Sequence, residues 1–166
     1  MAKITLGGNP AETSGNLPEI GSQIPDFKLV ATDLSTKTLT DFKNTRLILN
    51  IFPSVNTGVC AVSVRKFNTE ANSLKNTNVL CISRDLPFAQ DQFCAAEGLK
   101  NVIMLSDFKT GAFGNDFGLL ITGGIFDGLH SRCIIVVDTN GTILHTEQVL
   151  EVGEEPNYQA AINVLS

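Results

Sequence analysis

The chain has 166 residues, a mass of 17.8 kDa and a formal net charge of −5. With 43% hydrophobic and 17% charged residues it does not fit an intrinsically disordered chain, because such chains are poor in apolar residues and rich in charge. The acidic balance argues against nucleic acid as a partner. No apolar run approaches the ~20 residues that cross a bilayer, and the first residues lack an export signal, so we expect a cytoplasmic protein without membrane association.

The first part of the chain predicts two hairpins within one domain that spans residues 1–166. Residues 1–20 are expected to form an N-terminal hairpin or arm that turns at Gly7-Gly8. A second hairpin is predicted from Asp26–Thr32 and Thr36–Phe42, which flank a polar turn.

The middle of the chain alternates between buried strands and helices. Apolar runs predict three strands, at Leu47–Phe52, Val79–Ser83 and Val102–Ser106. One helix is predicted from Gly58, and another from Pro87 to Gly98 with Asp85 as its cap. The apolar residues that give the first helix its helical spacing are Val59, Val62, Phe67, Ala71 and Leu74.

The last part of the chain decides the fold class. After a stretch rich in Gly and Phe, Asn140-Gly141 predicts a hairpin between Arg132–Asp138 and Thr142–Gln148, and Pro156 begins a closing helix. Parallel crossovers followed by an antiparallel pair predict an α/β fold, a thioredoxin-like mixed sheet flanked by helices with an N-terminal β-hairpin extension. A wholly parallel, flavodoxin-like sheet is the alternative, and the hairpin argues against it.

The four cysteines raise the question of which thiol reacts. They are Cys60, Cys81, Cys94 and Cys133, and no two of them form a C-x-x-C pair, so we expect no metal site and no cofactor. Cys60 follows a strand and falls in the first turn of a helix, where unpaired N–H groups favour an anion such as a thiolate. The alternative is that Cys60 only packs beneath the helix as a small apolar residue.

The residues around Cys60 resemble a known family. Pro53, Thr57 and Cys60 form P-x-x-x-T-x-x-C, which resembles the active-site loop of peroxiredoxins. Longer stretches resemble the thiol peroxidase subfamily, the atypical two-cysteine peroxiredoxins, from about Gly21 to the C-terminus: NIFPSVNTGVCAVSVRKFN, VLCISRDLPFAQDQFCAAEGLKNV, GLHSRCIIVVD and EEPNYQAA. Asn56 departs from the pattern, in which an acid is usual, and the loss of that charge should favour a thiolate.

The resemblance implies a role for each matching residue. Cys60 would be the peroxidatic cysteine, which becomes a sulfenic acid, and Cys94 the resolving cysteine. Thr57 would exchange hydrogen bonds with sulfur and peroxide, Pro53 would shield the pocket from water, and Arg132 would hold its guanidinium near the sulfur. The resemblance further implies antioxidant reduction of hydrogen peroxide and organic hydroperoxides, thioredoxin as the reductant, and a homodimer.

The chemistry explains why such donors are needed. An unperturbed thiol with a pKa near 8.5 is about 3% thiolate at pH 7, so full ionisation gains at most ~30-fold, and the lower nucleophilicity of an acidic thiol offsets much of that gain. The transition state, in which charge grows on the departing oxygen, must therefore be stabilised. Candidate donors are Thr57, Arg132 and the N–H groups near Val59 and Cys60. Thr57 could instead be only a helix cap, and Arg132 only half of a surface ion pair.

Cys94 lies on a different predicted helix from Cys60. A disulfide needs the two Cα atoms within about 7 Å, so we expect one or both helices to unwind during turnover.

Other candidate residues receive structural interpretations. Cys81 and Cys133 are predicted core residues, and His130 and His145 are predicted to be solvated surface residues. Four phenylalanines belong either to the core or to an apolar pocket lining that favours bulky hydroperoxides: Phe108, Phe113, Phe117 and Phe126.

Two other functions would use the same reactive thiol. A thioredoxin-like redox sensor or binding protein would relay the oxidation of Cys60 to a partner. A dithiol oxidoreductase is disfavoured, because Thr57 occupies the place of the first cysteine of C-x-x-C.

Overall fold

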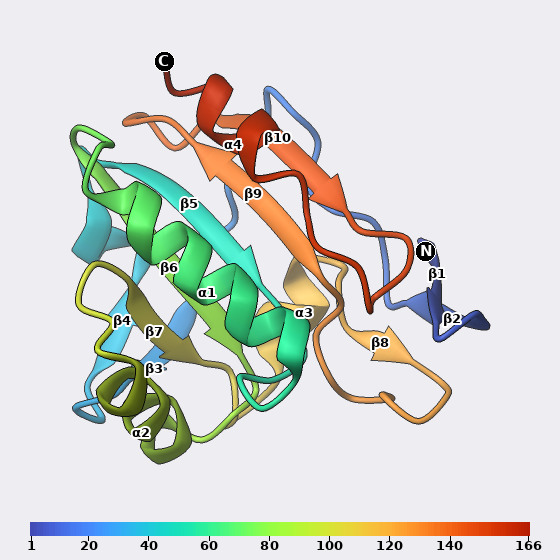
Figure 1. Ribbon diagram of the computed structural model, residues 1–166. Coiled ribbons are helices and arrows are strands. Elements are labelled where there is room, and N and C mark those ends of the chain that lie inside the picture. The colour runs from blue at the N-terminus through green and yellow to red at the C-terminus, as the bar shows by residue number, and fades with distance from the viewer.

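The computed structural model describes residues 1–166 and contains a seven-stranded mixed sheet with helices on both faces (Figure 1). Its strands are β3 (Lys28–Ala31), β4 (Thr36–Thr38), β5 (Arg46–Ile51), β6 (Thr77–Ser83), β7 (Ile103–Ser106), β9 (Cys133–Val137) and β10 (Ile143–Gln148). They lie in the order β10-β9-β5-β6-β7-β3-β4. Strands β5, β6 and β7 are parallel, whereas β9 is antiparallel to β5 and β3 to β7. The predicted thioredoxin-like sheet is confirmed, and the wholly parallel alternative is wrong.

The predicted N-terminal hairpin is part of a second, smaller sheet. Strand β1 (Lys3–Leu6) pairs with β2 (Asn9–Thr13), and β2 pairs with β8 (Ile121–Thr122). Gly7 and Gly8 make the turn with φ angles of 56° and 83°, in the left-handed region that glycine adopts readily. The hairpin is therefore held by pairing with the chain more than a hundred residues away.

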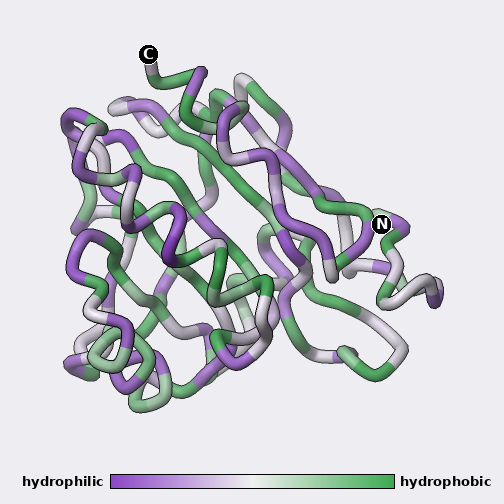
Figure 2. The backbone as a smooth tube through the Cα atoms, viewed as in Figure 1, coloured by the Kyte–Doolittle hydropathy of each residue, from purple (hydrophilic) through white to green (hydrophobic).

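The helices divide unequally between the two faces of the large sheet (Figure 1). Helices α1 (Gly58–Ala71), α2 (Pro87–Glu97) and α4 (Tyr158–Asn163) pack on one face, and α3 (Ala112–Asp116) with the 3-10 turn Leu39–Phe42 packs on the other. Strand side chains alternate between two apolar layers, and the hydrophobic colouring follows the central strands in Figure 2. None of the helices has both the length and the apolar character that a membrane span requires.

Several predicted boundaries are corrected by the structure. The cap position of α2 is Leu86, not Asp85, although Pro87 begins the helix and Gly98 ends it with φ 67° as predicted. The predicted strand Thr36–Phe42 stops at Thr38, because the Asp41 carboxylate accepts the Thr38 N–H at 2.8 Å and starts a 3-10 turn.

The C-terminal elements also differ in detail. Helix α4 begins two residues after Pro156, since the side chain of Asn157 caps it by accepting the Ala160 N–H at 3.0 Å. The predicted β9–β10 hairpin is confirmed, and Asp138 stabilises its loop by accepting the N–H groups of Asn140 and Thr142.

The apolar spacing predicts the buried face of α1 only in part, since Phe67 is buried and Ala71 and Leu74 pack against the same apolar layer. Val62 is 39% exposed, whereas Cys60, Val64 and Phe67 face the sheet. Cys60 therefore belongs to the buried face of the helix, which directs its side chain away from solvent.

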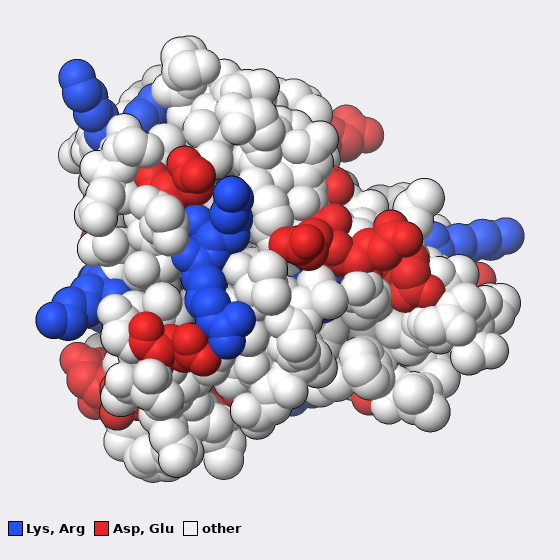
Figure 3. Space-filling view, in the orientation of Figure 1, with Lys and Arg blue, Asp and Glu red and all other residues white.

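Figure 3 shows basic side chains in the middle of the face that carries α1 and α2, with acidic ones on either side. Arg65 of α1 forms a two-bond ion pair with Glu97 of α2, at 2.8 and 2.9 Å. The two helices that carry Cys60 and Cys94 are thus joined at the surface.

Candidate active site

Cys60 lies at the N-terminal end of α1, directly beyond the carboxyl end of β5. The first i to i−4 bond of the helix runs from the Ala61 N–H to the Thr57 carbonyl, at 3.0 Å. The N–H groups of Gly58, Val59 and Cys60 come before that bond, so they give this end of the helix its positive potential. The sulfur is fully buried at this end.

Two of the predicted site residues contact the sulfur directly. Arg132 Nη2 donates to Cys60 Sγ at 3.2 Å, across 72 residues of sequence, and Thr57 Oγ1 also donates to Cys60 Sγ. The Thr57 side chain makes no bond to the N–H groups of its helix, so the interpretation of its hydroxyl as only a helix cap is wrong. Arg132 is 2% exposed, so the interpretation of a surface ion pair is wrong as well.

Arg132 is a buried cation without a carboxylate partner. Its Nε donates to the Val152 carbonyl at 2.8 Å, its Nη2 meets Cys60, and its Nη1 has no hydrogen-bond partner. The ion pairs of the protein join other residues. A buried charge is costly unless an opposite charge compensates it, and a thiolate at Cys60 is placed to do so.

A cavity of about 400 Å³ adjoins this cluster. Its lining includes Thr57, Gly58, Val59 and Arg132 from the site, together with Leu6 of β1, Phe126 of the loop between β8 and β9, and Val152 after β10. A larger cavity of about 510 Å³ lies between β3 and α3 and contains none of the predicted site residues. We assign the smaller cavity to the chemistry because it holds the donors.

The phenylalanine cluster divides between the two interpretations. Phe113 and Phe117 are buried and stacked with ring centroids 4.2 Å apart, as core residues are. Phe126 lines the cavity beside Arg132, and Phe108 is half-buried.

Asp85 holds the loop that leads into α1, a role that the sequence did not reveal. Its carboxylate accepts hydrogen bonds from Ser54 Oγ at 2.7 Å, from the Val55 N–H at 2.9 Å and from Ser83 Oγ at 2.6 Å. Pro53 is buried at the start of this loop and does not line the cavity, so its shielding role stays a prediction. The sequence shows an acidic residue after β6, but only the fold shows which groups donate hydrogen bonds to its carboxylate.

Cys94 is not brought to Cys60 in this structure, and all four cysteines are free thiols. Cys94 is half-buried on α2, which packs against β7, in the same apolar layer as Cys60. Burial, with a smaller contribution from Asp91, raises the pKa of the Cys94 thiol to about 11. Its role as the resolving cysteine stays a prediction.

Cys81 and Cys133 are core residues, as predicted. Both side chains are fully buried, and burial raises the pKa of each thiol to about 12. Thiols of this kind are unreactive at neutral pH.

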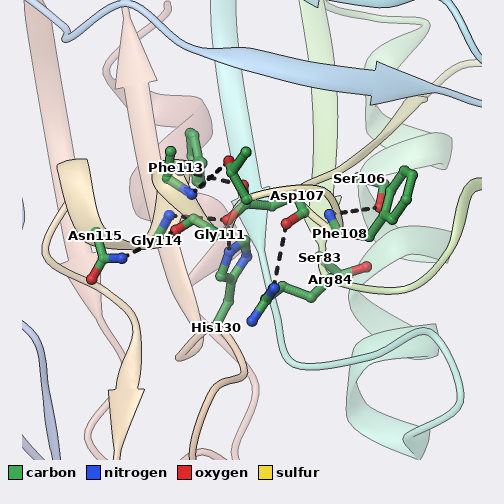
Figure 4. Close-up of polar contacts among 12 residues, drawn as sticks. Ser83, Arg84, Ser106, Asp107, Phe108, Gly111, Phe113, Gly114, Asn115 and His130 are labelled. Carbon is green, nitrogen blue, oxygen red and sulfur yellow. Dashed lines mark hydrogen bonds and ion pairs between the residues drawn. The ribbon is translucent and has the colours of Figure 1, made fainter.

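The prediction of solvated histidines is wrong for His130 (Figure 4). His130 is fully buried, and its Nε2 lies 2.8 Å from Asp107 Oδ2. The same carboxylate accepts the N–H groups of Phe113 and Gly114 at the start of α3. The ring packs on Gly114, where an added Cβ would come within 3.1 Å of it, so long-range packing decides this burial. His145 is half-buried.

Comparisons with known proteins agree with this geometry. The profile of the Redoxin family matches residues 19–162. The chain is 51% identical over 166 residues to a thiol peroxidase from Corynebacterium glutamicum, covering 100% of both chains. A peroxiredoxin-like protein from Aquifex aeolicus superposes with a TM-score of 0.93 at 31% identity, covering 99% of this chain and 96% of the other. A thiol peroxidase from Chromobacterium violaceum, at 22% identity, shares the fold with a TM-score of 0.91, covering 98% and 94%.

Proposed function

Because the chain belongs to the Redoxin family and is a peroxiredoxin-type peroxidase, we propose that Cys60 reduces hydrogen peroxide and organic hydroperoxides. In this proposal, Cys94 then resolves the Cys60 sulfenic acid by forming a disulfide, and thioredoxin reduces that disulfide. The observation that carries the proposal is the Cys60 sulfur held between the Arg132 guanidinium and the Thr57 hydroxyl at a helix N-terminus. A relay protein needs a reactive thiol but has no need of fixed donors beside a cavity for the leaving oxygen.

The first step transfers one oxygen to sulfur. The Cys60 thiolate attacks a peroxide oxygen, the O–O bond breaks, and the second oxygen gains a proton and leaves as water or an alcohol. Arg132 and the N–H groups at the start of α1 stabilise the charge that grows on this oxygen. Thr57 orients sulfur and peroxide, and Pro53 limits the entry of water.

The second step forms a disulfide. The Cys94 thiol attacks the Cys60 sulfenic acid, the S–O bond breaks and water leaves. Because Cys60 and Cys94 lie on two intact helices, at least one helix must open locally first. The two thiols of thioredoxin then reduce the disulfide and return both cysteines to thiols.

The cavity supports organic hydroperoxides as substrates beside hydrogen peroxide. Leu6, Val59, Ile125, Phe126 and Val152 give it an apolar lining next to the polar donors, which suits an alkyl chain attached to a peroxide. Residues 1–166 would act as one domain, in a homodimer in the cytoplasm, where thioredoxin is kept reduced.

Steady-state peroxide consumption with thioredoxin, thioredoxin reductase and NADPH tests this function. The wild type should consume many equivalents of peroxide per chain, and Cys60→Ser none. Cys94→Ser should perform one reduction per chain and then stop cycling with thioredoxin. Consumption limited to one equivalent by the wild type would contradict the enzyme and favour a redox sensor. Unchanged cycling by Cys94→Ser would move the resolving role to another thiol.

A further inference from the structure

Asn50 is a buried amide between the central strand β5 and helix α1. Its side chain is fully buried, and Nδ2 donates to Ser63 Oγ at 3.2 Å and approaches Cys81 Sγ at 3.8 Å. The amide oxygen Oδ1 is buried and has no hydrogen-bond partner. The residues around it, such as Ile48 and Val64, form an apolar layer. None of the chemistry described above uses this amide.

The amide is connected to the first turns of α1. Ser63, also fully buried, donates its hydroxyl to the carbonyl of Cys60 at 2.8 Å. A hydroxyl that bonds back to the carbonyl of the preceding turn weakens a helix slightly. Two successive hydrogen bonds thus connect the Asn50 amide, through the Ser63 hydroxyl, to the backbone carbonyl of Cys60.

An unpaired buried oxygen destabilises the closed helix more than the open one. A polar group without a partner loses its hydration and gains nothing in return while it is buried. When the first turns of α1 lift from the sheet, water reaches Oδ1 and this cost disappears. Asn50 therefore favours local opening of α1, compared with an apolar residue of similar shape.

Opening is needed because the two reactive cysteines belong to different parts of the sheet. Cys60 lies in the first turn of α1, beyond the carboxyl end of β5, whereas Cys94 lies on α2, which packs over β7, and both helices are intact. A disulfide tolerates a Cα separation of at most about 7 Å, so at least one of the two helices has to open before the bond can form.

We propose that Asn50 is a positioning residue that promotes the opening of α1 and so accelerates the condensation of the Cys60 sulfenic acid with Cys94. This inference rests on the proposed function. The reaction that it accelerates joins the two sulfurs and releases the sulfenic oxygen as water, and it needs no further reactant. Asn50 has no part in the attack on peroxide, which takes place in the closed site.

Replacement of Asn50 by an apolar residue should stabilise the closed form of α1, because it removes the unpaired oxygen and leaves no other group unpaired. The Ser63 hydroxyl still donates to the Cys60 carbonyl, so no hydrogen-bond donor or strong acceptor is left without a partner. Gln90 of α2 also has an unpartnered buried oxygen, but its Nε2 donates to the Leu105 carbonyl at 2.9 Å. Replacement of Gln90 would also remove this hydrogen bond to a backbone carbonyl, so Asn50 gives the cleaner test.

The experiment compares wild type, Asn50→Leu and the smaller Asn50→Val in a single turnover with one equivalent of hydrogen peroxide. Stopped flow should give an unchanged rate of sulfenic acid formation. The rate of disulfide formation should fall about tenfold, the factor that corresponds to about 1.4 kcal/mol. Hydrogen exchange of the reduced proteins should show stronger protection of the α1 amides in both variants.

Ser63→Ala is the matched control, because it removes the better partner of the Asn50 amide. We expect faster disulfide formation and weaker protection of α1 in this variant, because a buried amide that loses its partner costs more than the slight weakening that the Ser63 back-bond gives the helix. The double variant Asn50→Leu with Ser63→Ala should behave like Asn50→Leu, since the amide that donates to the Ser63 hydroxyl is already absent.

Disulfide formation that stays unchanged or becomes faster in both Asn50 variants would overturn the proposal. So would an equal slowing of sulfenic acid formation, because Asn50 would then shape the closed site. The exchange measurement uses no peroxide, so it tests the role of Asn50 even if the wild type forms no Cys60–Cys94 disulfide. That last result would instead refute the proposed function.

Discussion

Replacement of Arg132 by methionine tests the electrostatics of the site. The variant keeps a long buried side chain but removes the guanidinium, whose Nη2 lies 3.2 Å from Cys60 Sγ. At an effective dielectric constant of about 20, two unit charges at 3.2 Å attract each other by about 5 kcal/mol, which sets an upper limit on the loss. Removal of one preorganised donor from an oxyanion site costs about 10²–10³-fold in rate, or about 3–4 kcal/mol, which falls within this limit.

We therefore expect Arg132→Met to reduce peroxide about 10²–10³-fold more slowly than the wild type. The assay is stopped flow of the reduced protein with excess peroxide, so that resolution and recycling do not contribute. In parallel, alkylation of Cys60 by iodoacetamide at neutral pH should slow, because the thiolate loses its compensating charge.

Arg84→Met is the matched control for the loss of structural hydrogen bonds. Arg84 donates to the carbonyls of Gly128 and Asp107, as Arg132 does to that of Val152, but it does not contact the sulfur. This variant should keep the wild-type rate of peroxide reduction. A loss of less than tenfold in Arg132→Met, or an equal loss in both variants, would refute the electrostatic role.

Two further predictions follow from contacts around the site. Asp85→Asn should lower the free energy of unfolding by about 1–3 kcal/mol, measured by urea denaturation, because one of three charge-assisted bonds to Ser54, Val55 and Ser83 is lost; wild-type stability would exclude Asp85 as the anchor of the loop. Burial raises the pKa of Cys94 from 9.0 to about 11, so the closed helix α2 favours the neutral thiol and should open more easily as the pH rises from about 9 to 11. If Cys94 attacks after α2 has opened, disulfide formation should rise with pH and level off only near pH 11, because the neutral thiol of the closed helix stays the dominant state up to that pH. A rate that levels off near pH 9 would show that burial in α2 does not control the ionisation of this thiol.

Local patterns predicted most elements of the fold. The apolar run before Pro53, the helix from Gly58 and the turn at Gly141 each depend on residues within a few positions of one another, so the sequence alone identifies them. The motif from Pro53 to Cys60 identified the reactive sulfur in the same way. Arg132 was found only because a resemblance supplied it, since nothing local indicates that its side chain meets a residue 72 positions earlier.

The remaining features depend on contacts between distant segments. The sequence predicts a solvent-exposed side chain for His130, but Asp107 and Gly114 pack around it. Asp85 looked like a helix cap and instead holds the loop before α1. The short helix α3 lies in a stretch of glycines and phenylalanines without helical periodicity, so it depends on the Asp107 carboxylate at its start and on packing of Phe113.

The amino-acid sequence by itself determined the strands, the helices, the mixed sheet and the sulfur at a helix N-terminus, because backbone geometry and side-chain periodicity act over one or two turns of chain. The tertiary structure decided which cation compensates that sulfur, which distant segments line the cavity beside it, and that the amide of Asn50 is buried without a partner for its oxygen. These features arise because burial and charge compensation depend on the segments that surround a residue, and those segments come from distant parts of the sequence.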